Sequence, residues 1–87
     1  MNNKVLVKLY SPEFDREFDV FLPVNYLVWK VNKLVAKCIG DLCDEALNLK
    51  NEFFLINKKT NEIYNNNSVI RTTDIRNGTE LIILTKK

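Results

Sequence analysis

The sequence predicts an α+β fold, in which one long helix packs on one face of a mixed sheet of about five strands. Three observations predict it. Two alternating apolar runs flank a proline-containing turn, a stretch of helical periodicity follows, and Asn77-Gly78 leads into a final apolar run. The 87 residues, 46% of them hydrophobic, have the length and composition of a single small domain over residues 1–87.

The first two strands are predicted over residues 4–10 and 16–22, where apolar and outward positions alternate with a period of two. Ser11-Pro12-Glu13 separates them, because proline favours a turn and has no N–H to donate to a ladder. Two such runs joined by a short turn predict an antiparallel hairpin. The inward positions are Val5, Val7, Leu9, Phe18, Val20 and Leu22.

A helix is predicted from Tyr26 to about Leu42, with Asn25 as its N-cap. Apolar residues at three- and four-residue steps form one stripe, which is expected to face the sheet. These residues are Leu27, Val31, Leu34, Val35, Cys38 and Leu42. The polar residues 41–51 are expected to form the exit loop.

Two further strands are predicted after this loop, over residues 52–57 and 79–85. The first is apolar on both faces, so either Phe53 or Phe54 points outward. Residues 62–64 form at most a short strand, and residues 71–74, between Val69-Ile70 and Ile75, fit a single helical turn. In the last strand Leu81 and Ile83 are expected to point inward.

The composition argues against several classes of function. A net charge of +2, from 13 basic and 11 acidic residues mixed along the chain, is a weak basic signal, so no nucleic acid is expected as a partner. Apolar runs are at most four residues long, too short to cross a bilayer, and no direct membrane insertion is expected. The chain alone is interpreted as cytoplasmic.

No catalytic, metal or cofactor site is expected either. The chain has no histidine, so a cysteine nucleophile would lack its usual base and two thiolates would make a poor zinc site. Cys38 and Cys43 are spaced so that a disulfide between them is not expected. No glycine-rich phosphate loop occurs, and we expect no enzyme and no small-molecule substrate.

Two segments carry a resemblance to known proteins. Residues 70–84, with Ile75 and the Asn77-Gly78 turn before the last strand, resemble the ubiquitin-like β-grasp pattern. Residues 18–23, followed by the apolar positions of residues 28–35, are similar to the small YukD/EsaB proteins of bacterial type VII (ESX-like) secretion systems. The resemblance covers the whole chain and implies a ubiquitin-like β-grasp fold.

The resemblance also implies a role. It implies a non-enzymatic accessory component of type VII secretion, whose partner is a membrane-anchored secretion component or the system's ATPase. The chain ends in Thr85-Lys86-Lys87 and not in Gly-Gly, so conjugation is not expected. The alternatives are a ubiquitin-like adaptor unrelated to secretion and, with less support, a nucleic-acid-binding protein that uses Lys33, Lys37 and Lys58-Lys59.

Two surfaces are candidate protein-binding sites. The first is the sheet face turned away from the helix, where outward apolar side chains alternate with core residues. Its candidate residues are Leu6, Phe21, Ile82 and Leu84. The alternative is that these side chains are scattered or covered by a loop.

The second candidate surface is the back of the helix. If Val31 lies at the centre of the core stripe, Trp29 points away from it, and tryptophan is a favoured interface anchor. Its candidate residues are Trp29, Lys33 and Ala36. The alternative is that Trp29 folds under the loop of residues 44–51 or packs on Tyr26 and Lys33.

Overall fold

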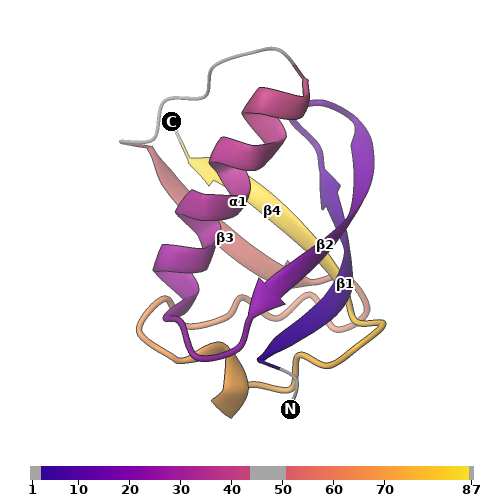
Figure 1. Cartoon of the computed structure of the whole chain (residues 1–87). Helices are drawn as coiled ribbons and strands as arrows, with labels where there is room; N and C mark the ends of the chain where they lie inside the picture. Colours follow the sequence, from indigo (N-terminus) through magenta and orange to yellow (C-terminus); the bar gives the residue numbers. More distant parts are fainter. Residues whose placement is uncertain (1–2, 44–50, 87) are drawn as a thin grey trace.

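The computed structural model describes residues 3–43 and 51–86 of the chain. The predicted exit loop therefore lies largely outside the described residues. The elements run, in chain order, β1 (Lys4–Ser11), β2 (Arg16–Pro23), α1 (Val28–Leu42), β3 (Glu52–Asn57), the short 3₁₀ helix η1 (Ile70–Thr72) and β4 (Glu80–Lys86) (Figure 1). The predicted α+β class is confirmed: one helix packs on one face of a mixed sheet.

The described strands form one sheet in the order β2-β1-β4-β3. β1 pairs antiparallel with β2 and parallel with β4, and β3 pairs antiparallel with β4. The first and last strands of the chain therefore lie side by side at the centre of the sheet (Figure 1). Leu9 is opposite Phe18 on one side and Leu81 on the other, so it lies in the middle of the inner face.

Residues 62–64 do not extend the sheet by a strand, so four strands, and not five, are present in the described part. Ile63 makes an isolated bridge to Ile56, one residue pair long. Asn61 has a left-handed backbone (φ 63), which turns the chain back along β3. The hydroxyl of Tyr64 donates to Asp74 at 2.6 Å, so the residue after this bridge is bonded to the segment that precedes β4.

The predicted stripe of α1 is wrong in its rotation. The buried residues of the helix are Val28, Val31, Asn32, Val35, Ala36, Ile39 and Gly40. Leu34, Cys38 and Leu42 are exposed instead. At about 100° per residue, the buried stripe is rotated by roughly 80° from the predicted one.

Contacts at the start of α1 explain this rotation. The N-cap is Leu27 and not Asn25, and no side chain caps the helix. Two free N–H groups of the first turn donate to a distant loop instead: Val28 N to Ser68 O at 2.8 Å and Trp29 N to Asn66 O at 3.1 Å. Buried Asn32 donates to Phe53 O at 3.2 Å. These bonds fix which side of the helix faces the sheet.

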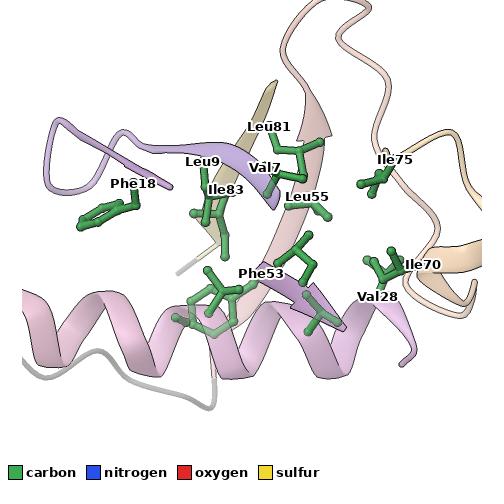
Figure 2. Packing of buried hydrophobic residues seen from close by; sticks show 14 of the residues in the cluster. Val7, Leu9, Phe18, Val28, Phe53, Leu55, Ile70, Ile75, Leu81 and Ile83 are labelled. Atoms are coloured by element: carbon green, nitrogen blue, oxygen red, sulfur yellow. The ribbon is translucent and has the colours of Figure 1, made fainter. Parts of the chain in front are cut away.

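The core lies between α1 and the inner face of the sheet (Figure 2). Every strand contributes alternate residues to it, as the period-two pattern predicts. Its fully covered members include Leu9, Leu22, Val28, Leu55, Ile70, Ile75 and Leu81. Phe53 is buried, so the outward phenylalanine of β3 is Phe54. Leu81 and Ile83 point inward as predicted.

Tyr64 should make the stability of the fold sensitive to alkaline pH. Burial and the hydrogen bond to Asp74 raise the pKa of Tyr64 to about 12. The unfolded value is about 10, so the folded state holds the phenolic proton more tightly. This stabilisation is fully present below about pH 10 and is lost as the pH rises from about 10 to 12. Urea unfolding across this range should show the decline.

Tyr64→Phe is the control for this alkaline decline. The variant loses the hydroxyl but keeps the ring, so its stability should fall less steeply over the same pH range. Absorbance titration of tyrosinate in the wild type should show a phenol with a pKa of about 12, and this phenol should be absent from Tyr64→Phe. A Tyr64→Phe curve parallel to that of the wild type would contradict the assignment.

Candidate functional site

The sheet face turned away from α1, here called the outer face, is the first candidate site. Alternation along the strands places every second side chain on it. These are Lys4, Leu6, Lys8, Tyr10, Glu17, Asp19, Phe21, Pro23, Glu52, Phe54, Ile56, Glu80, Ile82, Leu84 and Lys86. All four residues predicted for this site, Leu6, Phe21, Ile82 and Leu84, lie on this face.

The strand register divides these apolar side chains into two groups. Leu6 is opposite Phe21, and Phe21 is 65% exposed. The second group, here called the Ile82 cluster, is joined by three pairings across β1, β4 and β3: Tyr10 with Ile82, Ile56 with Ile82, and Phe54 with Leu84. The four predicted residues are therefore not one patch, because two belong to each group.

A charged row separates the two groups. Lys8 is opposite Asp19 on β2 and opposite Glu80 on β4. The Nζ atom of Lys8 also lies 3.7 Å from Oε1 of Glu17, in a salt bridge between exposed side chains. Opposite charges on neighbouring strands stabilise a sheet modestly, and here they also give the outer face an apolar–charged–apolar pattern.

The Leu6–Phe21 pair lies beside an open hollow of about 840 Å³. The turn at Asn77-Gly78 forms part of its lining together with Lys4 and Asp19. Asn77 Oδ1 accepts from Leu6 N at 2.8 Å, and Gly78 N donates to Leu6 O at 2.8 Å. Gly78 has a φ of 88°, a backbone conformation that residues with a side chain rarely adopt. These two hydrogen bonds fix the turn to β1, where it forms one wall of the hollow.

Tyr10 is held in place at the border of the Ile82 cluster. Its hydroxyl donates to Asp15 Oδ1 at 2.6 Å, and this hydrogen bond raises the pKa of Tyr10. The Nζ atom of Lys58 lies 6.0 Å from the centre of the Tyr10 ring. The cluster thus has an apolar centre with a cation and a hydrogen-bonded phenol at its edge.

The second candidate surface, on the helix, is only partly exposed. Trp29 is 42% exposed and Lys33 is exposed. Ala36 is 1% exposed and packs in the core, so its placement on the helix back is wrong. Its short side chain is covered by the sheet, whereas the longer indole of Trp29, about 20° away around the helix, reaches solvent.

Trp29 and Lys33 lie on the flank of α1 that faces β3, and not on the back of the helix. They line a small hollow of about 150 Å³ with Asn32, Glu52 and Phe53. Asn66, whose backbone carbonyl accepts from the backbone N–H of Trp29, lines the same hollow. The hollow is therefore part of the packing between helix, strand and loop.

Sequence reasoning missed three residues of the Ile82 cluster. Phe54 was one of two options, and Tyr10 and Ile56 were not among the candidates. The signal was present for Ile56, because Phe53, Leu55 and Asn57 share one face of β3 and therefore put residues 54 and 56 on the other. The same alternation points Tyr10 outward, because Leu9 is inward, but its place beside Ile82 depends on pairing with a strand distant in the sequence.

Metal ligands, thiols and helix length are three further properties of the described residues. Over residues 3–43 and 51–86, no group of three or more cysteine, aspartate or glutamate side chains could hold a metal ion. Cys38 and Cys43 are free thiols. Cys38 is exposed, whereas the predicted stripe of the helix placed it in the core. None of the helices in this part of the chain has the length and apolar character required to cross a membrane.

Comparison with known proteins gives structural neighbours only. No family model matches the sequence, and no curated protein matches it. Among solved structures, a chain of the MycP5-free ESX-5 inner membrane complex is similar with a TM-score of 0.76 at 16% identity. The match covers 98% of this chain and 21% of that chain, so this chain spans about a fifth of that neighbour's length.

Two further neighbours are ubiquitin-like domains. The N-terminal ubiquitin-like domain of the 4931431F19Rik protein matches with a TM-score of 0.74 at 17% identity, over 100% of this chain and 79% of that one. The EccD5 ubiquitin-like domain from Mycobacterium xenopi matches with a TM-score of 0.69 at 15% identity, over 99% and 98%. The predicted ubiquitin-like β-grasp fold is therefore confirmed.

Proposed function

We propose that this chain is a non-enzymatic protein-docking module that binds its partner through the Ile82 cluster of the outer face. The observation that carries the proposal is the grouping itself. Apolar side chains from three adjacent strands come together on a face that no described helix covers (Figure 1). Grouped apolar side chains at a surface are typical of interaction sites.

The charged row gives this surface its selectivity. A partner that contacts both the Ile82 cluster and the Leu6–Phe21 pair must also lie across Lys8, Asp19 and Glu80. Charges of both signs in a fixed order favour one orientation of the partner and oppose others. The apolar groups would supply most of the affinity, and the row would determine the register.

The more specific proposal is an accessory role in a bacterial type VII secretion system. The resemblance to YukD/EsaB proteins supports it, and so does the similarity to the EccD5 domain and to a chain of the ESX-5 inner membrane complex. In this proposal the chain acts in the cytoplasm and docks on a membrane-anchored component or on the ATPase.

A ubiquitin-like adaptor outside secretion is the second candidate. The similarity to the 4931431F19Rik domain, with a TM-score of 0.74, favours it nearly as strongly as the ESX-5 match at 0.76. The proteins that bind the chain distinguish the two. A secretion membrane component or ATPase among them favours the first proposal, and other proteins favour the second.

Leu84→Asp should weaken partner binding at least tenfold while leaving the fold intact. Leu84 is 39% exposed and packs in the Ile82 cluster, so a carboxylate there would be desolvated by a bound partner. The measurement is quantitative mass spectrometry of proteins captured by the tagged chain from its own cells. The affinity of the purified chain for the most enriched protein is then measured.

Leu34→Asp is the matched control for this substitution. It makes the same chemical change at an exposed leucine of α1, which packs on the other face of the sheet. Binding should be unchanged in this variant, and both variants should unfold at nearly the wild-type temperature. Equal capture by Leu84→Asp and the wild type would overturn the Ile82 cluster as the binding site.

A further inference from the structure

The two edges of the sheet differ in how they are covered. At the β3 edge, Asn57 N donates to Glu62 O and Tyr64 N donates to Leu55 O, both at 2.9 Å. The segment of residues 62–64 thus satisfies backbone groups that β3 would otherwise expose. Within the described parts of the chain, the middle of the β2 edge has no such cover.

The register shows which backbone groups of β2 point outward. Val24 N donates to Asn3 O at 2.9 Å, so this pair is hydrogen-bonded, and such pairs alternate with non-bonded ones along an antiparallel ladder. The pairs of Leu22, Val20 and Phe18 with β1 are then bonded as well. Glu17, Asp19 and Phe21 therefore direct their N–H and C=O groups away from the sheet.

Bonds on the other side of β1 confirm this assignment. Lys8 N donates to Thr79 O at 3.0 Å, and Leu6 O accepts from Gly78 N at 2.8 Å. Lys8 and Leu6 thus use their backbone groups toward β4, so their partners on β2, Asp19 and Phe21, are left facing solvent. A free row of donors and acceptors of this kind is a template for another strand.

The helix side of this edge is apolar except at its start, where the guanidinium of Arg16 lies 5.1 Å from the centre of the Phe18 ring. Leu42 is 65% exposed, and Cys38 lies one turn before it on the same flank of α1. Arg16 Nη1 donates to Cys43 Sγ at 3.4 Å, which places the end of the helix beside the start of β2. Half-buried Val20 lies on the same face of the sheet. A strand added to β2 would find apolar neighbours for every second side chain.

The opposite side of the edge is acidic. Glu17 and Asp19 point to the outer face beside the free backbone groups, and Asp19 is exposed. Side chains of an added strand that lie beside these carboxylates would be favoured if they were cationic. The edge thus requires two alternating kinds of side chain from one extended segment.

We propose that β2 is a second docking site, which binds an extended basic segment of a partner protein as an additional strand. Lysine or arginine side chains of that segment lie beside Glu17 and Asp19, and the alternating apolar side chains face Val20 and Leu42. A second copy of this chain fits less well, because pairing of two β2 strands brings four carboxylates to one face. The site uses the sheet edge and not the Ile82 cluster, so either proposal can fail while the other stands.

A synthetic peptide of alternating lysine and valine tests the site. With the full ¹⁵N-labelled chain and saturating peptide, amide exchange at Glu17, Asp19 and Phe21 should slow at least tenfold. The same peptide with glutamate in place of lysine should give no protection. Absence of protection with the lysine peptide, or protection at Ile82 and Leu84 instead, would overturn the proposal.

Backbone methylation of the peptide tests strand addition directly. In an antiparallel arrangement the lysine N–H groups face β2, and in a parallel one the valine N–H groups do. N-methylation of one set should therefore abolish binding, and N-methylation of the other should preserve it. Equal binding of both methylated peptides would show that no strand is added.

Two variants separate the contributions of charge and apolar contact. Asp19→Lys should lower the affinity for the lysine peptide about tenfold and raise the affinity for the glutamate peptide. Glu62→Lys, with the same change of charge at the opposite edge, should alter neither. Leu42→Ser should lower the affinity for the lysine peptide several-fold. Protection of the β2 edge without peptide, together with dimers in sedimentation, would identify a second copy as the occupant and overturn the proposal.

Discussion

Leu9→Ala is expected to lower the free energy of unfolding by about 3–5 kcal/mol. Leu9 has no exposed surface and lies between Phe18 and Leu81 at the middle of the inner face (Figure 2). Both neighbouring strands are fixed by hydrogen bonds, so the cavity left by the side chain cannot collapse easily. The loss is a large part of the roughly 4–13 kcal/mol that stabilises a domain of this size.

Leu84→Ala is the matched control, because it removes the same atoms from the outer face of the same sheet. Leu84 is partly exposed, so its removal should cost about 1 kcal/mol or less. Urea unfolding of the two variants beside the wild type gives the comparison. Similar losses for Leu9→Ala and Leu84→Ala would contradict the assignment of inner and outer faces.

Ala36→Lys is expected to destabilise the fold by about 2–4 kcal/mol. Ala36 lies on the buried side of α1 and packs in the core. A longer side chain has no space there, and a charge would be buried. The predicted placement of Ala36 on the back of the helix implies instead that lysine would be harmless there. Thermal and urea unfolding distinguish the two placements.

Leu34→Lys provides the opposite case. The sequence pattern places Leu34 in the core stripe, whereas the structure exposes it. Lysine should therefore change stability by no more than about 0.5 kcal/mol at this position. A large loss for Leu34→Lys together with tolerance of Ala36→Lys would show that the predicted rotation of the helix, and not the observed one, is correct.

The faces of the strands could be predicted from the sequence because a single alternation decides them. Once Val7 and Leu9 are assigned inward, Leu6 and Lys8 must point outward, and the same holds for Phe18 and Phe21. No contact with a distant segment is needed for this step. The inward and outward residues of β1, β2 and β4 accordingly agree with the prediction.

The rotation of α1 could not be predicted, because it depends on contacts far along the chain. Asn32 is polar, and the pattern gives no reason to bury it. In the structure its Nδ2 atom donates to Phe53 O at 3.2 Å and to Asn66 Oδ1 at 3.3 Å, while its own Oδ1 is buried without a hydrogen-bond partner among the described residues. A tertiary contact thus overrides the apolar pattern of the helix.

The outer face was predicted in content but not in arrangement. Alternation gives which side chains point outward, but their grouping depends on the strand order and on the register between β1 and β4. That register places Lys8 beside Glu80 and Tyr10 beside Ile82. The sequence carries no local signal for either pairing, so the division into two apolar groups emerged only from the structure.

The central position of β1 and β4 also has a consequence for the order of folding. Leu6 and Asn77, which join these strands, are 71 residues apart, so closing that loop costs about 2–3 kcal/mol more than closing a hairpin turn. During synthesis the β1–β2 hairpin and α1 emerge early, but β3 has no neighbour in the sheet until β4 follows. Ile82 and Leu84 emerge with that same strand. A growing chain therefore completes the sheet and the proposed docking surface in one step, so binding through this face would have to wait for β4.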